Sequence, residues 1–172
     1  MAIPATSEVH TAVACALKSL YTDDAQLFHF DAGERTLVGH FARYLSENVR
    51  TWGSEWSIDV EYNRMLTPEH DEVTYKYLLD VRGASRRPAY PDLIVHQRGV
   101  DGWHGGNLLV VEAKKSPTRI DQREDHAKLV AWMRELQYRY GLRLELGPRS
   151  AKGSWIDASS DPTAPLSAIP LW

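Results

Sequence analysis

The sequence has little of what marks secreted, membrane or zinc-binding proteins. Cys15 is the single cysteine among 172 residues, which excludes an intrachain disulfide and a cysteine-rich zinc site. No stretch approaches the roughly 20 consecutive apolar residues that cross a bilayer, and the N-terminus has no basic segment followed by a long apolar run. We therefore expect a cytoplasmic protein in a reducing compartment, with no secretory signal and no membrane partner.

Net positive charge is also missing. The formal net charge is −3 and the pI is about 6.2, so the molecule as a whole is not a basic nucleic-acid binder. Contacts with nucleic acid would have to come from local patches, for which ordinary solvated surface is an equally good explanation. The candidate residues for such patches are Arg82, Arg86, Arg87, Arg98, Lys114, Lys115, Arg119, Arg123 and Lys128.

Two common catalytic motifs are absent from the chain. It contains no Gly-x-x-x-x-Gly-Lys segment of the kind that binds nucleotide phosphates. Its seven histidines are scattered, without the His-x-x-x-His spacing of zinc enzymes. Neither a phosphate-binding loop nor a histidine-based zinc site is therefore predicted.

Alternating helices and strands are predicted in a chain of one-domain size, with 43% hydrophobic residues to fill a core. Apolar spacing of three and four residues predicts helices at about 7–21, 34–49 and 121–140, the last stopped by Gly141. Short or alternating apolar runs predict strands at 56–64, 90–96, 107–114 and 142–146. We expect 22–33 to be irregular, 73–81 to be a strand or a helix, and 99–106 to be a hairpin loop. The segment 148–172 is expected to be a loosely ordered tail with Trp155 and Trp172 as anchors.

Two of the predicted strands carry charges at positions that should be buried. Asp92 follows Pro91 at the start of one strand, and Glu112 and Lys114 end the other on a shared face. Unpaired buried charge costs several kcal/mol, so such groups pair with each other or bind a metal ion. The alternative is that Asp92 caps a turn and that Glu112 pairs with Lys114 or Lys115 at a solvated strand end.

This arrangement resembles the PD-(D/E)xK nuclease superfamily, with Pro91-Asp92 as the first half of the motif and Glu112-Ala113-Lys114 as the second. The resemblance covers about residues 33–147. It implies a restriction-endonuclease-like α/β fold, an α-β-β-β-α-β core whose mixed central sheet is flanked by helices, preceded here by an extra N-terminal helix. Hard oxygen ligands from Asp92, Glu112 and the carbonyl of Ala113 suit Mg²⁺, for which Mn²⁺ substitutes.

Glu34 is expected at the N-terminal edge of the core-facing side of the helix at 34–49. A first-turn acid also favours the helix dipole, which explains the residue without any site. Members of the superfamily often carry a glutamate on the helix before the sheet, so the resemblance adds Glu34 to the acidic cluster. Glu47, on a more polar side of the same helix, is the weaker alternative.

The strand at 56–64 is predicted to place Asp59 and Glu61 on one face and to turn the other face to the core through Trp56, Ile58, Val60 and Tyr62. The solvent side is the simpler explanation of the two acids. A site role for Glu61 or Arg64 is the alternative, because this strand should adjoin the acidic hairpin.

Several residues outside the motif are predicted to meet a substrate. The candidate nucleic-acid contacts are Arg64, Arg86, Arg87, Lys115 and Gln122. Gln122 and Asp125 extend the apolar stripe of the helix at 121–140 toward the end of the Glu112 strand, where capping is the simpler role. Trp103 and His104, in the hairpin loop, either touch a substrate or pack locally.

The first functional hypothesis is a Mg²⁺-dependent nuclease that acts on DNA rather than RNA, with Asp92, Glu112, Lys114 and Glu34 as its catalytic group. Lys114 would orient or deprotonate the attacking water, or offset the phosphate charge. By resemblance it would be an endonuclease of a bacterial or phage nucleic-acid-processing or defence system, working as a homodimer or with a partner protein. The second hypothesis is a catalytically inactive member of the fold that serves as a binding or assembly module. A small-molecule enzyme is less favoured because no cofactor motif is present.

Overall fold

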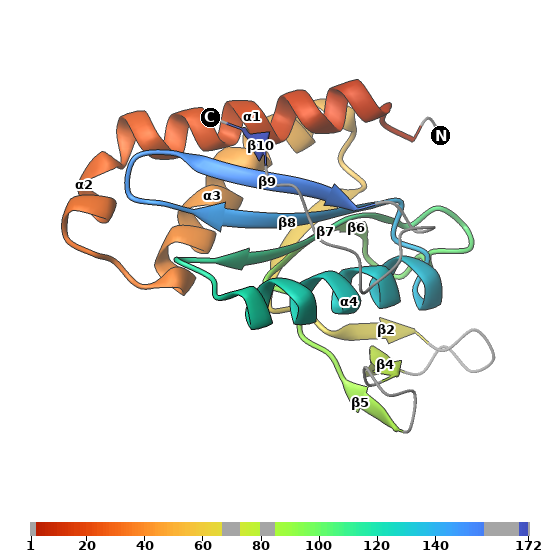
Figure 1. Ribbon diagram of the computed structural model, residues 1–172. Helices are drawn as coiled ribbons and strands as arrows, with labels where there is room; N and C mark the ends of the chain where they lie inside the picture. Colours follow the sequence, from red (N-terminus) through yellow and green to blue (C-terminus); the bar gives the residue numbers. More distant parts are fainter. Residues whose placement is uncertain (1–2, 67–72, 80–84, 157–168, 172) are drawn as a thin grey trace.

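The computed structural model describes residues 3–66, 73–79, 85–156 and 169–171. A mixed α/β architecture is confirmed, with helices on both faces of a central sheet (Figure 1). The helices are α1 (Thr6–Asp23), α2 (Ala25–His29), α3 (Glu34–Val49), the 3₁₀ turn η1 (Arg50–Trp52) and α4 (Arg119–Glu135).

The central sheet has the strand order β1-β6-β7-β8-β9-β10. Its members are β1 (Trp56–Val60), β6 (Leu93–Gln97), β7 (Asn107–Lys114), β8 (Tyr140–Leu146), β9 (Ala151–Ile156) and the two-residue β10 (Ile169–Pro170). Only the pairing of β7 with β8 is parallel among those described, and α4 makes that connection. Two small antiparallel ribbons, β2 (Arg64–Leu66) with β3 (Val73–Tyr75) and β4 (Tyr77–Leu79) with β5 (Arg86–Pro88), stand beside α4.

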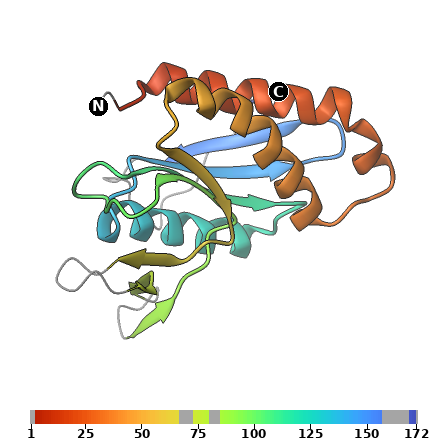
Figure 2. The same cartoon turned by 180° about the vertical axis from the view of Figure 1, so that it is seen from behind.

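Two apolar cores lie on opposite faces of the sheet. The α1 and α3 helices cover one face, as the view from behind also shows (Figure 2). In α3 the predicted apolar stripe is buried there, including Leu37, Phe41 and Leu45. The α4 helix covers the other face, where Leu129 and Trp132 pack against Ile94 and Val110. Successive residues of β6 and β7 therefore alternate between two dry cores, which explains why both strands read as continuous apolar runs.

The predicted long strand at 56–64 is interrupted in the structure. Glu61 has a left-handed φ of 51°, so β1 ends at Val60 and the alternation is lost. Tyr62 consequently packs on the α4 side, whereas Trp56 and Ile58 pack on the α1 and α3 side. The prediction that all of the alternating apolar residues share one face is therefore wrong, and Val60 is exposed.

Three further boundaries differ from those expected. The short helix α2 occupies part of the predicted irregular stretch at 22–33. The α4 helix ends at Glu135, so Tyr140 and Gly141 belong to β8 rather than to the helix and its stop. The prediction of a loose tail is wrong for Ala151–Ile156, because β9 pairs with Gly141 to Leu146 of β8. Trp155 is an anchor, stacked on His10 with ring centroids 3.9 Å apart, whereas Trp172 lies outside the described residues.

Candidate functional site

Asp92 and Glu112 lie side by side at one end of the β6–β7 pair. Leu93 faces Val111 across the ladder, so the next positions outward are Asp92 and Glu112, which share the α4 face. The Asp92 Oδ2 atom accepts a 2.7 Å hydrogen bond from the backbone N–H of Ala113. The two carboxylates of the predicted motif are therefore brought together at this end of the two central strands.

Lys114 and Glu34 lie beside the two acids at the same end of the strands. The Lys114 Nζ atom lies 3.2 Å from Glu34 Oε1 and 4.0 Å from Asp92 Oδ2. The second oxygen of Glu34 accepts a 3.1 Å hydrogen bond from the backbone N–H of Lys115. Glu34 is the first residue of α3, so this contact ties the start of that helix to the end of β7. The position inferred for Glu34 from its place before the apolar stripe is correct.

Glu112 is the most deeply buried acid of the group, at 1% exposure. The Nζ atom of Lys128, on α4, lies 2.7 Å from Glu112 Oε1 and donates a 2.8 Å hydrogen bond to Oε2. It also donates to the carbonyl of Tyr90. Burial raises the pKa of Glu112 to about 8, and the nearby Lys128 only partly counteracts that rise.

A fourth acid, Asp125, faces the same space from α4. It is 7% exposed, and its Oδ2 atom has no hydrogen-bond partner among the described residues. Burial raises the pKa of Asp125 to about 6, against the opposing effect of Lys114 and Lys128. The sequence pattern favoured a capping role here, but the N-cap of α4 is Thr118, which forms a capping box with Asp121.

The environment raises the pKa of both Asp92 and Lys114, which disfavours the charged form of the acid and favours that of the lysine. Burial raises the pKa of Asp92, although the Ala113 N–H and Lys114 oppose the shift. Burial by itself lowers the pKa of Lys114, but the carboxylates of Asp92, Glu34 and Asp125 outweigh it and leave the pKa raised. Lys114 is therefore an ammonium ion throughout the neutral pH range.

The donor chemistry of this cluster fits a hard divalent cation. Asp92, Glu112 and Asp125 supply carboxylate oxygens, the ligands that Mg²⁺ prefers, and the buried Oδ2 atom of Asp125 lacks a hydrogen bond among the described residues. In the arrangement present, no three acidic, histidine or cysteine side chains of the described chain are close enough to enclose an ion. The Lys128 ammonium contacts both oxygens of Glu112, so it is the group that a cation would have to replace.

The predicted nucleic-acid contacts are scattered over the surface. Lys115 lies at the site, but its ammonium contacts Asp31 and the carbonyl of Ala32. Arg86 is 3.7 Å from Glu135 at the far end of α4, and Arg87 is exposed on the same short strand.

The other predicted contacts are also dispersed. Arg64 stacks on Tyr75 in a separate ribbon, and Gln122 is half-buried on the first turn of α4. Arg82 lies outside the described residues. Glu61 lines a shallow cleft with Glu34 and Asp92, where it pairs with Arg35 at 2.8 Å.

The alternation of its strand predicted that Asp59 lies on the solvent side. The structure instead shows its carboxylate largely buried and paired. It accepts a 2.8 Å hydrogen bond from the buried His96 and pairs with both ends of the Arg98 guanidinium. Burial lowers the pKa of His96 to about 4, so the imidazole is neutral and its Nε2–H donates to the aspartate. This pair was missed because its members lie 37 residues apart in the sequence.

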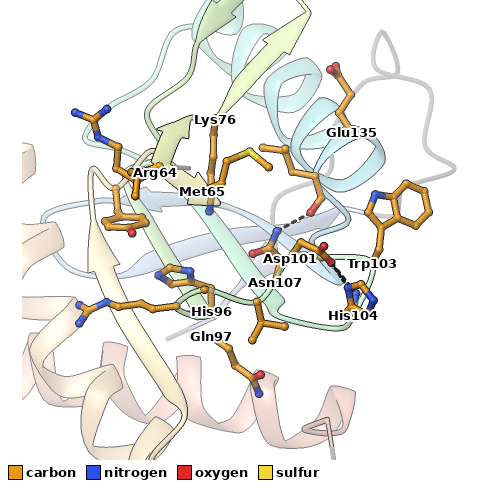
Figure 3. Close-up of a pocket in the computed structure, with 17 residues that line it drawn as sticks. Arg64, Met65, Lys76, His96, Gln97, Asp101, Trp103, His104, Asn107 and Glu135 are labelled. Atoms are coloured by element: carbon orange, nitrogen blue, oxygen red, sulfur yellow. Dashed lines mark hydrogen bonds and ion pairs between the residues drawn. The ribbon is translucent and has the colours of Figure 1, made fainter. Parts of the chain in front are cut away.

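The contacts of two lysines were not predicted from the sequence. Lys128 was a candidate for a nucleic-acid patch, with solvated surface as the equal alternative, and its three-residue spacing from Asp125 on α4 was the available signal for a place at the acidic cluster. Lys76 lies in the stretch 73–81, whose structure the pattern left open, and is buried. It lines a large groove at the opposite end of the β6–β7 pair (Figure 3).

Comparisons with known proteins add no assignment to this geometry. No protein-family model, curated protein or solved structure matches the chain. Among the described helices, none has both the length and the apolar character needed to cross a bilayer. Any function must therefore be argued from the residues themselves.

Proposed function

We propose that the chain is a Mg²⁺-dependent phosphodiesterase that cleaves DNA. One observation carries the proposal: the Lys114 ammonium lies within 4.0 Å of the carboxylates of Glu34 and Asp92, which come from two other segments. Glu112 adds a buried carboxylate on the same face. Acids that repel one another are costly to gather at a strand end unless a cation site compensates them.

The order of the secondary-structure elements supports a restriction-endonuclease-like core. Leaving aside the two small ribbons, the chain runs through α3, β1, β6, β7, α4 and β8. That is the expected order of helix, three strands, helix and strand. The antiparallel pairing of β6 with β7 and the parallel pairing of β7 with β8 support the proposal, because Asp92 directly precedes one central strand and Glu112 and Lys114 end the next.

In the proposed reaction, Asp92, Glu112 and the Ala113 carbonyl would hold the cation, and Asp125 would add a nearby carboxylate. When bound, Mg²⁺ lowers the pKa of a water molecule and offsets charge on the phosphate. The raised pKa of Lys114 makes it a hydrogen-bond donor to a phosphate oxygen rather than a general base. Glu34 fixes the Lys114 amine through its 3.2 Å contact and so positions that donor.

A cleavage assay tests the proposal. The purified protein is incubated with supercoiled plasmid and with single-stranded DNA in Mg²⁺ or Mn²⁺. We expect cleavage by the parent and a loss of at least about 100-fold in Lys114→Gln and Asp92→Asn, since each removes charge stabilisation in the transition state. Lys152→Gln, an exposed lysine on β9, is the matched control and should retain the parental rate. Equal rates in all four proteins would refute the assignment.

A catalytically inactive binding module is the second candidate, and one observation favours it. Lys128 already contacts both oxygens of the buried Glu112, as a permanent structural partner would. If that pair is permanent, the parent will cleave no substrate and will bind no divalent ion. Lys128→Gln separates the two candidates: it should tighten Mn²⁺ binding if a cation competes for Glu112, and should only destabilise the fold if the pair is structural.

A further inference from the structure

A groove of about 600 Å³ lies at the end of β6 and β7 remote from the acidic cluster. Its walls come from residues 62–65 and 73–76, the end of β6, the hairpin loop and the end of α4 (Figure 3). His96 at the groove is four residues along the strand from Asp92, a separation of roughly 13 Å at the usual rise per residue. The groove is therefore a separate cavity, and its volume lies within the range of small-molecule sites.

Lys76 is the most unusual group in this groove. It is 3% exposed, and its ammonium donates a 2.7 Å hydrogen bond to the Tyr138 hydroxyl. Three aromatic rings surround it at 5.1 to 6.0 Å, those of Tyr62, Trp132 and Tyr138. No carboxylate of the described residues lies within ion-pair distance of it. Burial lowers the pKa of Lys76 to about 8, although the charge of Asp59 opposes the shift, so at pH 7 Lys76 remains mainly an ammonium ion.

An ammonium ion has three N–H donors, and Tyr138 accepts only one from Lys76. Burying a charge without an anionic partner costs several kcal/mol. Figure 3 shows the Lys76 side chain directed into the groove rather than out to solvent. A bound anion would supply the missing acceptors and a negative charge in direct contact, whereas Asp59 acts on Lys76 only from beyond ion-pair distance.

Arg64 provides a second cation at the rim of the same groove. Its guanidinium stacks over the Tyr75 ring at 3.8 Å and has no carboxylate partner among the described residues. The acids of the groove are already engaged: Asp101 holds His104, and Glu135 accepts from the Leu79 N–H. Lys76 and Arg64 are therefore cations of the groove that have no carboxylate partner among the described residues, and they are available to meet an anion.

An exposed aromatic surface completes the groove. Trp103, in the hairpin loop, is 76% exposed and lies on the opposite side of the groove from Arg64 in Figure 3. An exposed indole does not pack locally, so it is available to stack against a planar ring. Tyr62 lines the inner wall, next to the Lys76 ammonium.

We propose that this groove binds a nucleoside phosphate, with the phosphate at Lys76 and Arg64 and the base stacked on Trp103. Cations combined with an aromatic platform recognise this chemistry, since arginine and lysine bind phosphate oxygens and any base presents a π-face. The ligand is either a free nucleotide or one nucleotide of a strand. The inference does not depend on the proposed hydrolytic site, because none of the acidic cluster lines the groove.

Isothermal titration at pH 7 in EDTA tests the proposal while excluding any metal-dependent cleavage. The probes are adenosine 5′-monophosphate, adenosine, ribose 5-phosphate, inorganic phosphate and a five-residue deoxyadenosine oligonucleotide. We expect the mononucleotide to bind more tightly than each of its fragments. Tighter binding of the oligonucleotide would identify a strand as the source of the ligand, and tighter binding of the mononucleotide would identify a free nucleotide.

Variants assign the binding to the groove. Arg64→Gln and Trp103→Ala change exposed side chains and should each weaken binding by about tenfold or more. Lys76→Met should do the same, with its folding checked by thermal unfolding because Lys76 is buried. Arg149→Gln, an exposed arginine outside the groove, is the matched control and should bind like the parent.

The proposal is overturned if the parent binds neither the mononucleotide nor the oligonucleotide. It is also overturned if Arg64→Gln and Trp103→Ala bind as tightly as Arg149→Gln. Failure of the cleavage assay leaves these binding results unaffected, so the two proposals fail separately.

Discussion

Replacing Glu112 with glutamine measures how much this buried acid lowers the stability of the folded protein. The side chain is 1% exposed, and burial raises its pKa from 4.5 to about 8. Between these values the unfolded chain has lost the proton that the folded protein still holds. The folded state then binds more protons, so the stability of the metal-free parent falls as the pH rises through this window.

The size of the effect follows from the pKa difference. At pH 7 the solution lies 2.5 pH units above the ordinary pKa of 4.5 and still below the folded value, so the cost is about 3 kcal/mol at 1.36 kcal/mol per unit. Glutamine has nearly the same shape and no charge. We therefore expect Glu112→Gln to be more stable than the parent by about 3 kcal/mol at pH 7 and by almost nothing at pH 4.

Urea unfolding in EDTA, at pH 4, 5.5, 7 and 8.5, checks this prediction. Glu47→Gln, an exposed acid on α3 and the alternative candidate from the sequence, is the control and should follow the parent. In Mg²⁺ the difference in stability between Glu112→Gln and the parent should become smaller, because a cation that binds the native carboxylates stabilises the parent but not Glu112→Gln. Parallel stability curves for the parent and Glu112→Gln across this pH range would refute the reasoning.

Two further predictions concern the elements that frame the site and the groove. Thr118→Ala removes the N-cap of α4, whose hydroxyl accepts from the Asp121 N–H, and should lower the free energy of unfolding by about 1 kcal/mol in a urea titration. Asp59→Ala leaves the buried His96 without its acceptor and should cost about 2 kcal/mol at pH 7. Since Arg98 and His96 hold the pKa of Asp59 below its ordinary 3.8 despite burial, this difference should persist at neutral pH and disappear as the pH falls through the lowered value; a difference that grows on acidification would contradict the assignment.

Much of the framework could be predicted because local pattern and tertiary packing agree. The α1 and α3 helices and the strands β7 and β8 lie close to their expected bounds, since each has one clear apolar signal: helical spacing in α1 and α3, a continuous run in β7 and alternation in β8. The strand β9 was missed because Ala151–Ile156 contains small and polar residues, and its place depends on pairing with β8 rather than on its own pattern. The break in β1 at Glu61 is a backbone event that apolar alternation does not encode.

In the candidate site, too, residues placed by local pattern could be predicted and residues placed by tertiary packing could not. Asp92, Glu112 and Lys114 could be placed together because strand parity and a short hairpin fix their positions. Asp125 was predicted as an alternative contact, with capping favoured, and Lys128 as a candidate surface cation. Both face the acidic cluster because α4 crosses the sheet, whereas charged residues on a helix ordinarily indicate solvent. Lys76 could not be predicted as a buried cation, since its neighbours Tyr62, Trp132 and Tyr138 come from distant parts of the chain.

Titration with Mn²⁺, followed by electron paramagnetic resonance of the free ion, tests most directly whether the acidic cluster is one cation site. The account predicts that the parent binds one equivalent at neutral pH, and that Asp92→Asn and Glu112→Gln each weaken that binding by at least about tenfold. Glu47→Gln should bind like the parent. Absence of binding in the parent, or equal binding in all four proteins, would contradict the account.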